Sequence, residues 1–253
     1  MKKTLGYIVF FIILFIQAGC LLKQKGIDRL WFYTYTSVPA KEEDNEITPA
    51  SFLYLQKDGS YTRDFGQFEY GKWKRKDSLL LLINNKGVVI GFPIKLMAGN
   101  ELDLLSENGS VLNFESQPDR SSSATDDPFT IENNQWRIPA TKKENEQELK
   151  NRLKNHCRFH EVYFKWALDN NLATVDVRST PSLLKIYGNG FALKKFEELP
   201  PAWRSYFYDE EDCRKATGIL KDIFDTSDIA WAHTDNRFKM FISAFQQLEQ
   251  KLK

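Results

Sequence analysis

Hydrophobic positions between residues 27 and 115 fall in short runs, and turn-forming residues separate the runs. Apolar and polar residues alternate within several runs, which is the two-residue period of a β-strand with one buried face. The turns include Asp58-Gly59 and Asn108-Gly109, pairs that readily adopt the positive φ angles of tight hairpins. Eight strands are predicted: Leu30–Thr36, Ser51–Gln56, Tyr61–Phe65, Gln67–Lys74, Leu79–Asn84, Val88–Met97, Glu101–Leu105 and Val111–Glu115. Short strands at this spacing predict an antiparallel meander that closes into a small barrel, with a sandwich as the alternative.

The apolar phase changes within one of these strands. Phe68 and Tyr70 are even-numbered, whereas Trp73 is odd-numbered, so the three rings cannot share one face of a regular strand. Gly71 lies at the change of phase. A β-bulge at Gly71 would turn the aromatic side chains toward one interior, and we therefore predict a bulge there.

The second half of the chain has a different pattern. Residues 116–128 are polar and predict a linker between the barrel (27–115) and a second domain (129–253). Apolar residues then recur at spacings of three and four, which predicts helices. The predicted helices are Glu144–Asn170, Asp209–Asp225 and one beginning near Thr234 or Asp235. The predicted strands are Phe129–Ile138, Leu172–Arg178, Leu183–Tyr187 and Phe191–Lys195, so the second domain is expected to be α+β.

The amino terminus contains a targeting pattern. Two lysines precede an apolar run from Leu5 to Ile16, and Ala18-Gly19-Cys20 follows it. This segment resembles a bacterial lipoprotein signal, which implies a signal peptide over 1–19, cleavage before Cys20 and lipid on its thiol. Residues 20–26 would then tether an exported protein to the membrane, and Leu21 after the cysteine favours the outer membrane over the inner one. The alternatives are an uncleaved membrane anchor from Leu5 to Leu22 and simple secretion.

The predicted barrel carries motifs of its own. Trp31 lies in the first strand, a long loop covers 37–50, and Asp58-Gly59-Ser60-Tyr61 and Gly71-Lys72-Trp73 follow. These features resemble bacterial lipocalin-like lipoprotein domains. The resemblance implies an eight-stranded barrel that carries a small hydrophobic ligand. Strands this short favour an interior filled by side chains instead, and both alternatives stay open.

Composition and charge restrict the classes of function that the chain can have. The chain has 35 basic and 34 acidic residues, a formal net charge of +1, which does not favour a nucleic-acid partner. The sequence contains no P-loop, no dinucleotide fingerprint and no nucleophile elbow, so we expect neither a cofactor nor catalysis. The prediction is a lipid-anchored cell-envelope protein that acts as a binding or interaction module for a protein partner.

Two histidines supply the alternative chemistry. His156 and His160 are four residues apart on a predicted helix, so they share a face and could hold a transition metal. His233 or a carboxylate would be the third ligand of such a metal-dependent enzyme. The simpler interpretation is that both histidines pack among aromatic residues, and on it no metal is expected.

Three further features allow two interpretations each. Cys157 and Cys213 could form a disulfide in an exported protein or remain buried thiols. The acidic run 209–212 is better explained as the first turn of a helix than as a calcium loop. The segment 199–203, which contains Trp203, could be a recognition surface, but a buried connection is favoured because tryptophan is usually buried.

Overall fold

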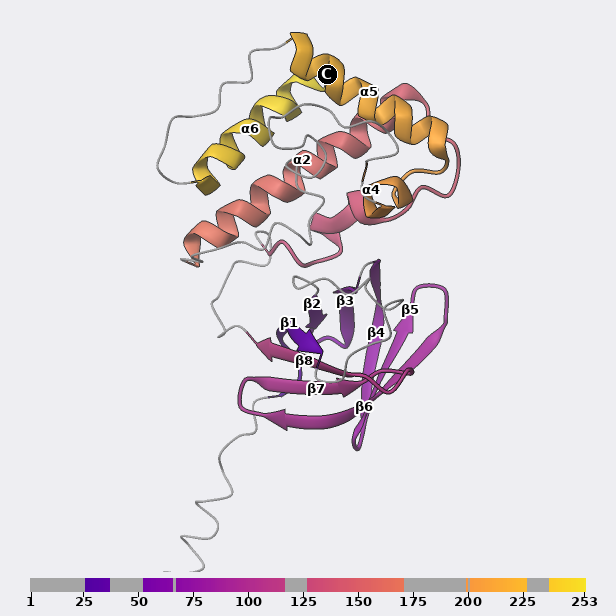
Figure 1. The fold of residues 1–253 in the computed structure, drawn as a ribbon, viewed down its shortest axis with the longest axis vertical. Coiled ribbons are helices and arrows are strands. Elements are labelled where there is room, and N and C mark those ends of the chain that lie inside the picture. The colour runs from indigo at the N-terminus through magenta and orange to yellow at the C-terminus, as the bar shows by residue number, and fades with distance from the viewer. Residues whose placement is uncertain are drawn as a thin grey trace, which may run out of the picture.

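The computed structural model describes residues 26–36, 52–65, 67–116, 127–170, 199, 201–226 and 237–253. A closed β-barrel comes first along the chain, and a helical region lies against one side of it (Figure 1). The strands are β1 (Leu30–Thr36), β2 (Phe52–Leu55), β3 (Ser60–Asp64), β4 (Phe68–Lys76), β5 (Leu79–Asn84), β6 (Val89–Ala98), β7 (Glu101–Leu105) and β8 (Val111–Ser116).

Each strand pairs antiparallel with its neighbours in the chain, and β1 pairs with β8 to close the barrel. This confirms the predicted eight-stranded antiparallel meander. Its turns contain Gly59, Gly87, Gly99 and Gly109, all at positive φ. The interior is filled by a cluster of buried side chains: Ile27, Trp31, Tyr33, Leu53, Leu55, Tyr61, Leu80, Leu82, Phe92, Leu102, Leu104, Leu112 and Phe114.

The bulge predicted at Gly71 is wrong. Strand β4 pairs with β3 and β5 in continuous register through Gly71. Trp73 packs against the barrel interior, whereas Phe68 and Tyr70 belong to the cluster formed with the helical region. The phase change therefore reflects two hydrophobic cores on opposite faces of one regular strand. The register shifts that do occur lie in β1 and in β6.

Gly71 instead allows a close approach between strands. A Cβ atom at this position would lie 2.0 Å from the carbonyl oxygen of Ile83 and 2.8 Å from Cα of Asn84. Both are backbone atoms, so β5 would have to move away. We expect Gly71→Ala to lower the free energy of unfolding by about 3 kcal/mol, which urea denaturation would measure. The matched control is Gly91→Ala, whose added methyl group would meet only leucine side chains at 3.5 Å; equal losses in both variants would contradict the explanation.

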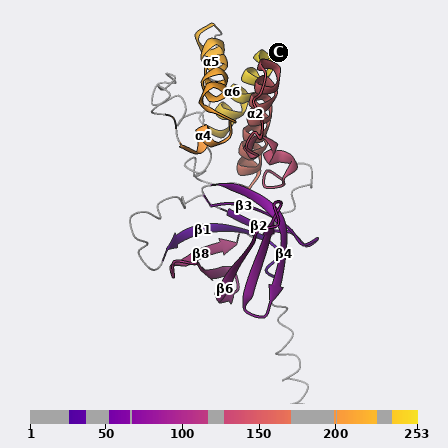
Figure 2. The ribbon, with the colours of Figure 1, turned by 90° about the vertical axis from the view of Figure 1, so that its right-hand side faces the viewer.

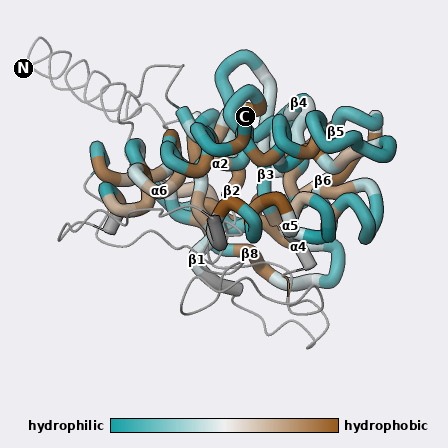
Figure 3. Tube along the Cα trace, turned by 90° about the horizontal axis from the view of Figure 1, so that it is seen from above, coloured by the Kyte–Doolittle hydropathy of each residue, from teal (hydrophilic) through white to brown (hydrophobic). Residues whose placement is uncertain are grey.

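The helical region is built from η2 (Glu132–Arg137, a 3₁₀ helix), α2 (Glu146–Asp169), α4 (Pro201–Ser205), α5 (Glu210–Thr226) and α6 (Arg237–Lys251). The long helix α2 begins with a capping box, in which Asn145 and Glu148 each accept a hydrogen bond from the backbone N–H of the other. Hydrophobic and hydrophilic residues alternate along α2 and α6, as expected of helices with one buried side (Figure 3). Two of the three predicted helices, over 144–170 and 209–225, thus match α2 and α5 closely, and α6 follows as the third.

The strand predicted over Phe129–Ile138 is wrong, because η2 occupies most of this segment. The side-chain amide of Asn134 donates to the carbonyl oxygens of Pro128 and Thr130, at 2.6 and 2.9 Å. These bonds satisfy backbone groups locally, so the segment turns rather than extends.

Several predicted features lie outside the described residues. They are the signal segment 1–19, Cys20, the loop 37–50, most of the linker 116–128, the strands predicted between 172 and 195, and His233. Within the described part of the chain, no helix is long and apolar enough to cross a membrane.

Candidate functional site

The barrel and the helical region share one hydrophobic cluster. Phe129 is at its centre: its ring lies 4.9 Å from that of Phe52 on the barrel and 4.9 Å from that of Trp166 on α2. The hydroxyl of Thr62 in β3 donates to the carbonyl oxygen of Phe129 at 2.5 Å. Figures 1 and 2 show the helices gathered over the side of the barrel that β1–β4 form. The helices therefore cover outward side chains of these strands, among them Phe52, Phe68 and Tyr70, whereas the outward lysines at the end of β4 stay exposed.

A buried ion pair crosses the same boundary. Nη1 of Arg137, at the end of η2, lies 2.8 Å from Oδ2 of Asp64 in β3. Their side chains are only 2% and 10% exposed. The guanidinium also lies 4.5 Å from the ring centroid of Phe159 and 5.4 Å from that of Trp136. A charge pair this enclosed must persist as a pair, because either charge alone would be buried without compensation.

This pair could not be predicted from the sequence. Arg137 and Asp64 are 73 residues apart, and neither stands in a motif. No local signal in the sequence predicts that they meet.

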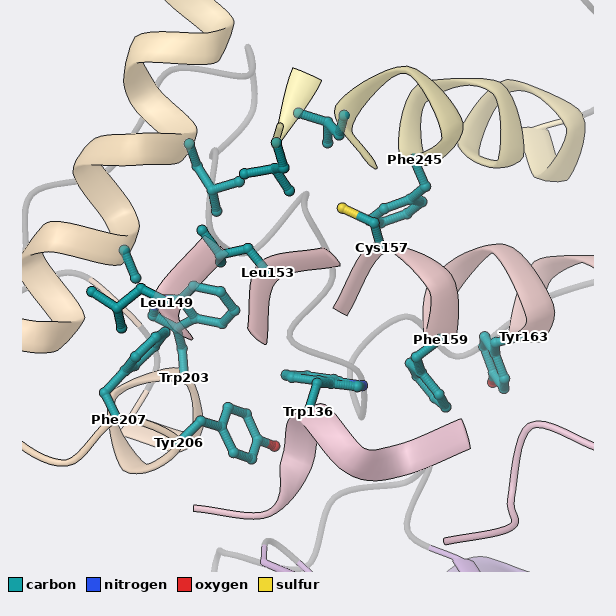
Figure 4. Packing of buried hydrophobic residues seen from close by; sticks show 14 of the residues in the cluster. Trp136, Leu149, Leu153, Cys157, Phe159, Tyr163, Trp203, Tyr206, Phe207 and Phe245 are labelled. Carbon is teal, nitrogen blue, oxygen red and sulfur yellow. The ribbon is translucent and has the colours of Figure 1, made fainter. Parts of the chain in front are cut away.

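His156 and His160 lie together inside the helical region, as their spacing predicts. Their ring centroids are 4.2 Å apart, and the side chains are 1% and 0% exposed. Aromatic rings surround them: Trp136, Phe159, Phe164, Trp203 and Phe245. Figure 4 shows Trp136, Trp203 and Phe245 in this core, on η2, α4 and α6.

The histidines are neutral in the fold. Burial lowers the pKa of His156 well below its usual value, and the neighbouring His160 lowers it further. Burial also lowers the pKa of His160 to about 3. Nδ1 of His160 lies 2.8 Å from the carbonyl oxygen of His156, which can only accept, so Nδ1 carries the proton.

This environment favours packing over metal binding. Among the described residues, no three histidine, cysteine, aspartate or glutamate side chains come together as a metal-ligand set. The residues that enclose the pair are aromatic and supply no carboxylate. The ring nitrogens of His156 and Nε2 of His160 have no hydrogen-bond partner among the described residues. Such buried nitrogens can be retained only because the rings are uncharged.

Cys157 and Cys213 are both buried free thiols in the structure. Cys157 lies on α2, in the same hydrophobic cluster as Phe245 of α6 (Figure 4), whereas Cys213 lies on α5. Burial raises the pKa of Cys157 and raises that of Cys213 to about 11. Thiols of this kind are poor nucleophiles at neutral pH.

The acidic run 209–212 starts helix α5, as predicted. The carboxylate of Asp209 accepts the backbone N–H of Asp212 at 2.9 Å, and the following acidic residues occupy the first turn. Asp212 is fully buried and accepts the backbone N–H of Glu144 at 2.9 Å, so it holds the segment before α2. These carboxylates cap helices and pair with neighbouring groups rather than surrounding a cation.

Trp203 is also buried, as the favoured interpretation of 199–203 predicts. It is 1% exposed and belongs to the cluster shared with the barrel. Its indole N–H lies 3.3 Å from the hydroxyl of Thr217 on α5. The segment therefore joins elements of the core instead of presenting a tryptophan to a partner.

Several polar side chains lie together on the inner face of the barrel. Nε of Arg63 donates to Oε2 of Glu69 at 2.6 Å, and the amide of Asn84 donates to Oε1 at 2.7 Å. Arg63 also lies over the ring of Phe92, at 5.7 Å. Tyr61 is buried nearby, and burial together with the charge of Glu69 raises its pKa to about 12. Arg63, Glu69 and Asn84 thus satisfy one another, whereas the Tyr61 hydroxyl has no hydrogen-bond partner among the described residues.

A shallow cleft of about 220 Å³ lies on the surface of the helical region. It lies between the start of α2, the end of α5 and the end of α6, and acidic, basic and aliphatic residues line it. Typical small-molecule pockets are larger, roughly 300–1,000 Å³. The cleft therefore does not define a ligand.

Comparisons with protein-family models, with curated proteins and with solved structures found no match to this chain. The assignment of a function accordingly depends on the sequence and the geometry described above.

Proposed function

We propose that this protein is a lipid-anchored component of the bacterial cell envelope and that it acts as a non-catalytic interaction module. The observation that carries the proposal is the Ala18-Gly19-Cys20 sequence at the end of the apolar run that starts at Leu5. Small residues before a cysteine suit cleavage by a signal peptidase, and the new amino-terminal cysteine supplies a thiol for lipid. Leu21, rather than an aspartate, favours the outer membrane.

The fold supports a role in binding rather than in catalysis. Among the described residues, His156, His160, Cys157 and Cys213 are buried in one core, where both histidines are neutral and the pKa of each thiol is raised. The barrel interior is occupied by bulky side chains, which favours a lipocalin-like scaffold over a carrier of a hydrophobic ligand. The barrel would then be the module close to the membrane, and the helical region would extend toward a protein partner.

Replacing the lipidated thiol tests the anchor. We expect Cys20→Ser to abolish labelling by radioactive palmitate and to move most of the protein from the membrane fraction to the soluble fraction, or to leave it unprocessed. Cys213→Ser is the matched control, because it makes the same chemical change at a thiol that the fold buries. Wild-type labelling and fractionation of Cys20→Ser would overturn the proposed anchoring.

A further inference from the structure

The outer face of β4 and β5 carries two parallel ladders of side chains. Three exposed lysines of β4 pair across the strands with three aliphatic residues of β5. The pairs are Lys72 with Ile83, Lys74 with Leu81, and Lys76 with Leu79. The alternate residues Leu80 and Leu82 are buried in the barrel, so the aliphatic ladder faces outward. It belongs to neither hydrophobic cluster of the described residues.

Strand β6 continues this face. Ile83 pairs with Val89, Leu81 with Gly91, and Leu79 with Pro93. The side chains of Leu79 and Leu81 lie 3.5 Å from the position that a Cβ atom of Gly91 would occupy, so they spread over the glycine. Val89 is 57% exposed. We call these nine residues of β4, β5 and β6 the ladder face.

Charge is distributed unevenly around the barrel. Residues 68–98 contain six exposed basic side chains and a single exposed acidic one, Asp77. The other carboxylate in this range, Glu69, is held by Arg63 inside the barrel. Residues 101–116 contain no basic residue, and Glu101, Glu107 and Glu115 are exposed there. The ladder face, with Lys72, Lys74 and Lys76, therefore lies in the basic part of the described barrel.

Its chemistry fits a bilayer better than a protein. Protein interfaces are enriched in aromatic residues and depleted of lysine, whereas the ladder face has three lysines and no aromatic ring. Lysines beside an aliphatic strip can place their ammonium groups among phosphates while the strip enters the headgroup layer. An anionic lipid surface thus complements both ladders at once.

The described chain starts beside the turn between β6 and β7, and β6 is one of the three strands of the ladder face. Arg29 donates to the carbonyl oxygens of Gly26 and Gly99, at 3.0 and 3.2 Å, so Gly26 lies beside the turn that ends β6. Figures 1 and 2 place β6 on the side of the barrel away from the helices. Six residues lead from Cys20 to Gly26, a span of at most about 20 Å. A lipid at Cys20 would hold the ladder face close to the bilayer.

We propose that the ladder face lies on the anionic surface of a phospholipid bilayer, with Leu79, Leu81, Ile83 and Val89 entering the headgroup layer. This inference deepens the proposed anchoring but makes a separate claim, since the face should bind lipid without acylation. The anchor then fixes the protein to a membrane, and the ladder face orients it so that the helices point away.

The test uses residues 20–253 with serine at position 20, which keeps every described residue and removes the lipid. We expect this protein to float with vesicles of 70% phosphatidylcholine and 30% phosphatidylglycerol, and not with phosphatidylcholine alone. Each lysine at an anionic surface contributes roughly five-fold in the binding constant. Lys72→Gln, Lys74→Gln and Lys76→Gln together should weaken binding on the order of 100-fold, and 0.5 M salt should weaken it as well.

The matched control is Lys215→Gln, Lys239→Gln and Lys251→Gln, which makes the same charge change at exposed positions of α5 and α6. It should bind vesicles like the parent protein. Equal binding to neutral vesicles, no binding to anionic ones, or equal losses in both triple variants would overturn the proposal. Sedimentation velocity gives one more contrary outcome. If the parent protein were a dimer and only the Lys72, Lys74 and Lys76 triple variant were a monomer, a second copy of the chain would cover the ladder face instead of a bilayer.

A fluorescent probe reports the orientation directly. Val89→Cys can be labelled selectively with a nitrobenzoxadiazole dye, since Cys157 and Cys213 are buried. Anionic vesicles should shift its emission to the blue, whereas the same dye at Glu107→Cys, on the β7–β8 turn, should not respond. A response at Glu107 alone would overturn the assigned face. Palmitate labelling of the native protein tests Cys20 independently of every result here.

Discussion

Lowering the pH from 6.5 to 4.5 is expected to lower the free energy of unfolding by about 5 kcal/mol, because the fold keeps two histidines uncharged. His156 and His160 are buried side by side, and burial lowers the pKa of both. In the unfolded chain each histidine binds a proton near pH 6.5. Below that pH the unfolded state therefore binds more protons than the folded state, and acid favours unfolding. Each histidine contributes about 1.4 kcal/mol per pH unit, over two units.

The free energy of unfolding should fall as the pH falls. The stabilisation is fully present above pH 6.5 and is lost as the pH falls toward the folded-state values, about 3 for His160. Urea denaturation at intervals between pH 7 and pH 4.5 would measure the slope. His156→Gln with His160→Gln should flatten the profile, and each single variant should remove about half of the slope. A double variant that keeps the wild-type slope would falsify the assignment to this pair.

The strands and the long helices could be predicted because their signals are local. Hairpin glycines such as Gly59 and Gly109 mark the turns, and alternation between them marks the strands. The spacing of His156 and His160 likewise placed both side chains on one face of α2, which the structure confirms. In each case the residues that carry the signal are within one turn or one hairpin of each other.

In strand β4, the local pattern was not sufficient to predict the packing. Its pattern correctly indicates two sets of apolar side chains. The predicted bulge at Gly71 was wrong because it assumed that both sets face one core. Phe68 and Tyr70 pack against the helical region, while Trp73 packs inside the barrel. A two-residue period identifies the faces of a strand but not the number of cores around it. The second core forms from residues beyond 127, so no pattern within β4 could indicate it.

The ion pair between Arg137 and Asp64 is non-local in the same way, and it leads to the second large effect. We expect Asp64→Ala to lower the free energy of unfolding by about 4 kcal/mol, because Arg137 would keep its charge in a site only 2% exposed. The guanidinium could not escape to water without separating η2 from the barrel, since it lies against Trp136 and Phe159. Urea denaturation of the variant would measure the loss.

An apolar double variant separates the cost of an unpaired charge from the value of the pair. Asp64→Leu with Arg137→Met should be more stable than Asp64→Ala, because apolar side chains of similar volume leave no buried charge. Arg214→Ala on α5 is the control, since its partner Glu210 is exposed and such pairs contribute about 0.5 kcal/mol. If the double variant were as unstable as Asp64→Ala, the charges would be stabilising the contact between barrel and helices. If the double variant were more stable than Asp64→Ala, Phe129 and its aromatic neighbours would hold the barrel and the helical region together. The ion pair would then fix only how the two pack against each other.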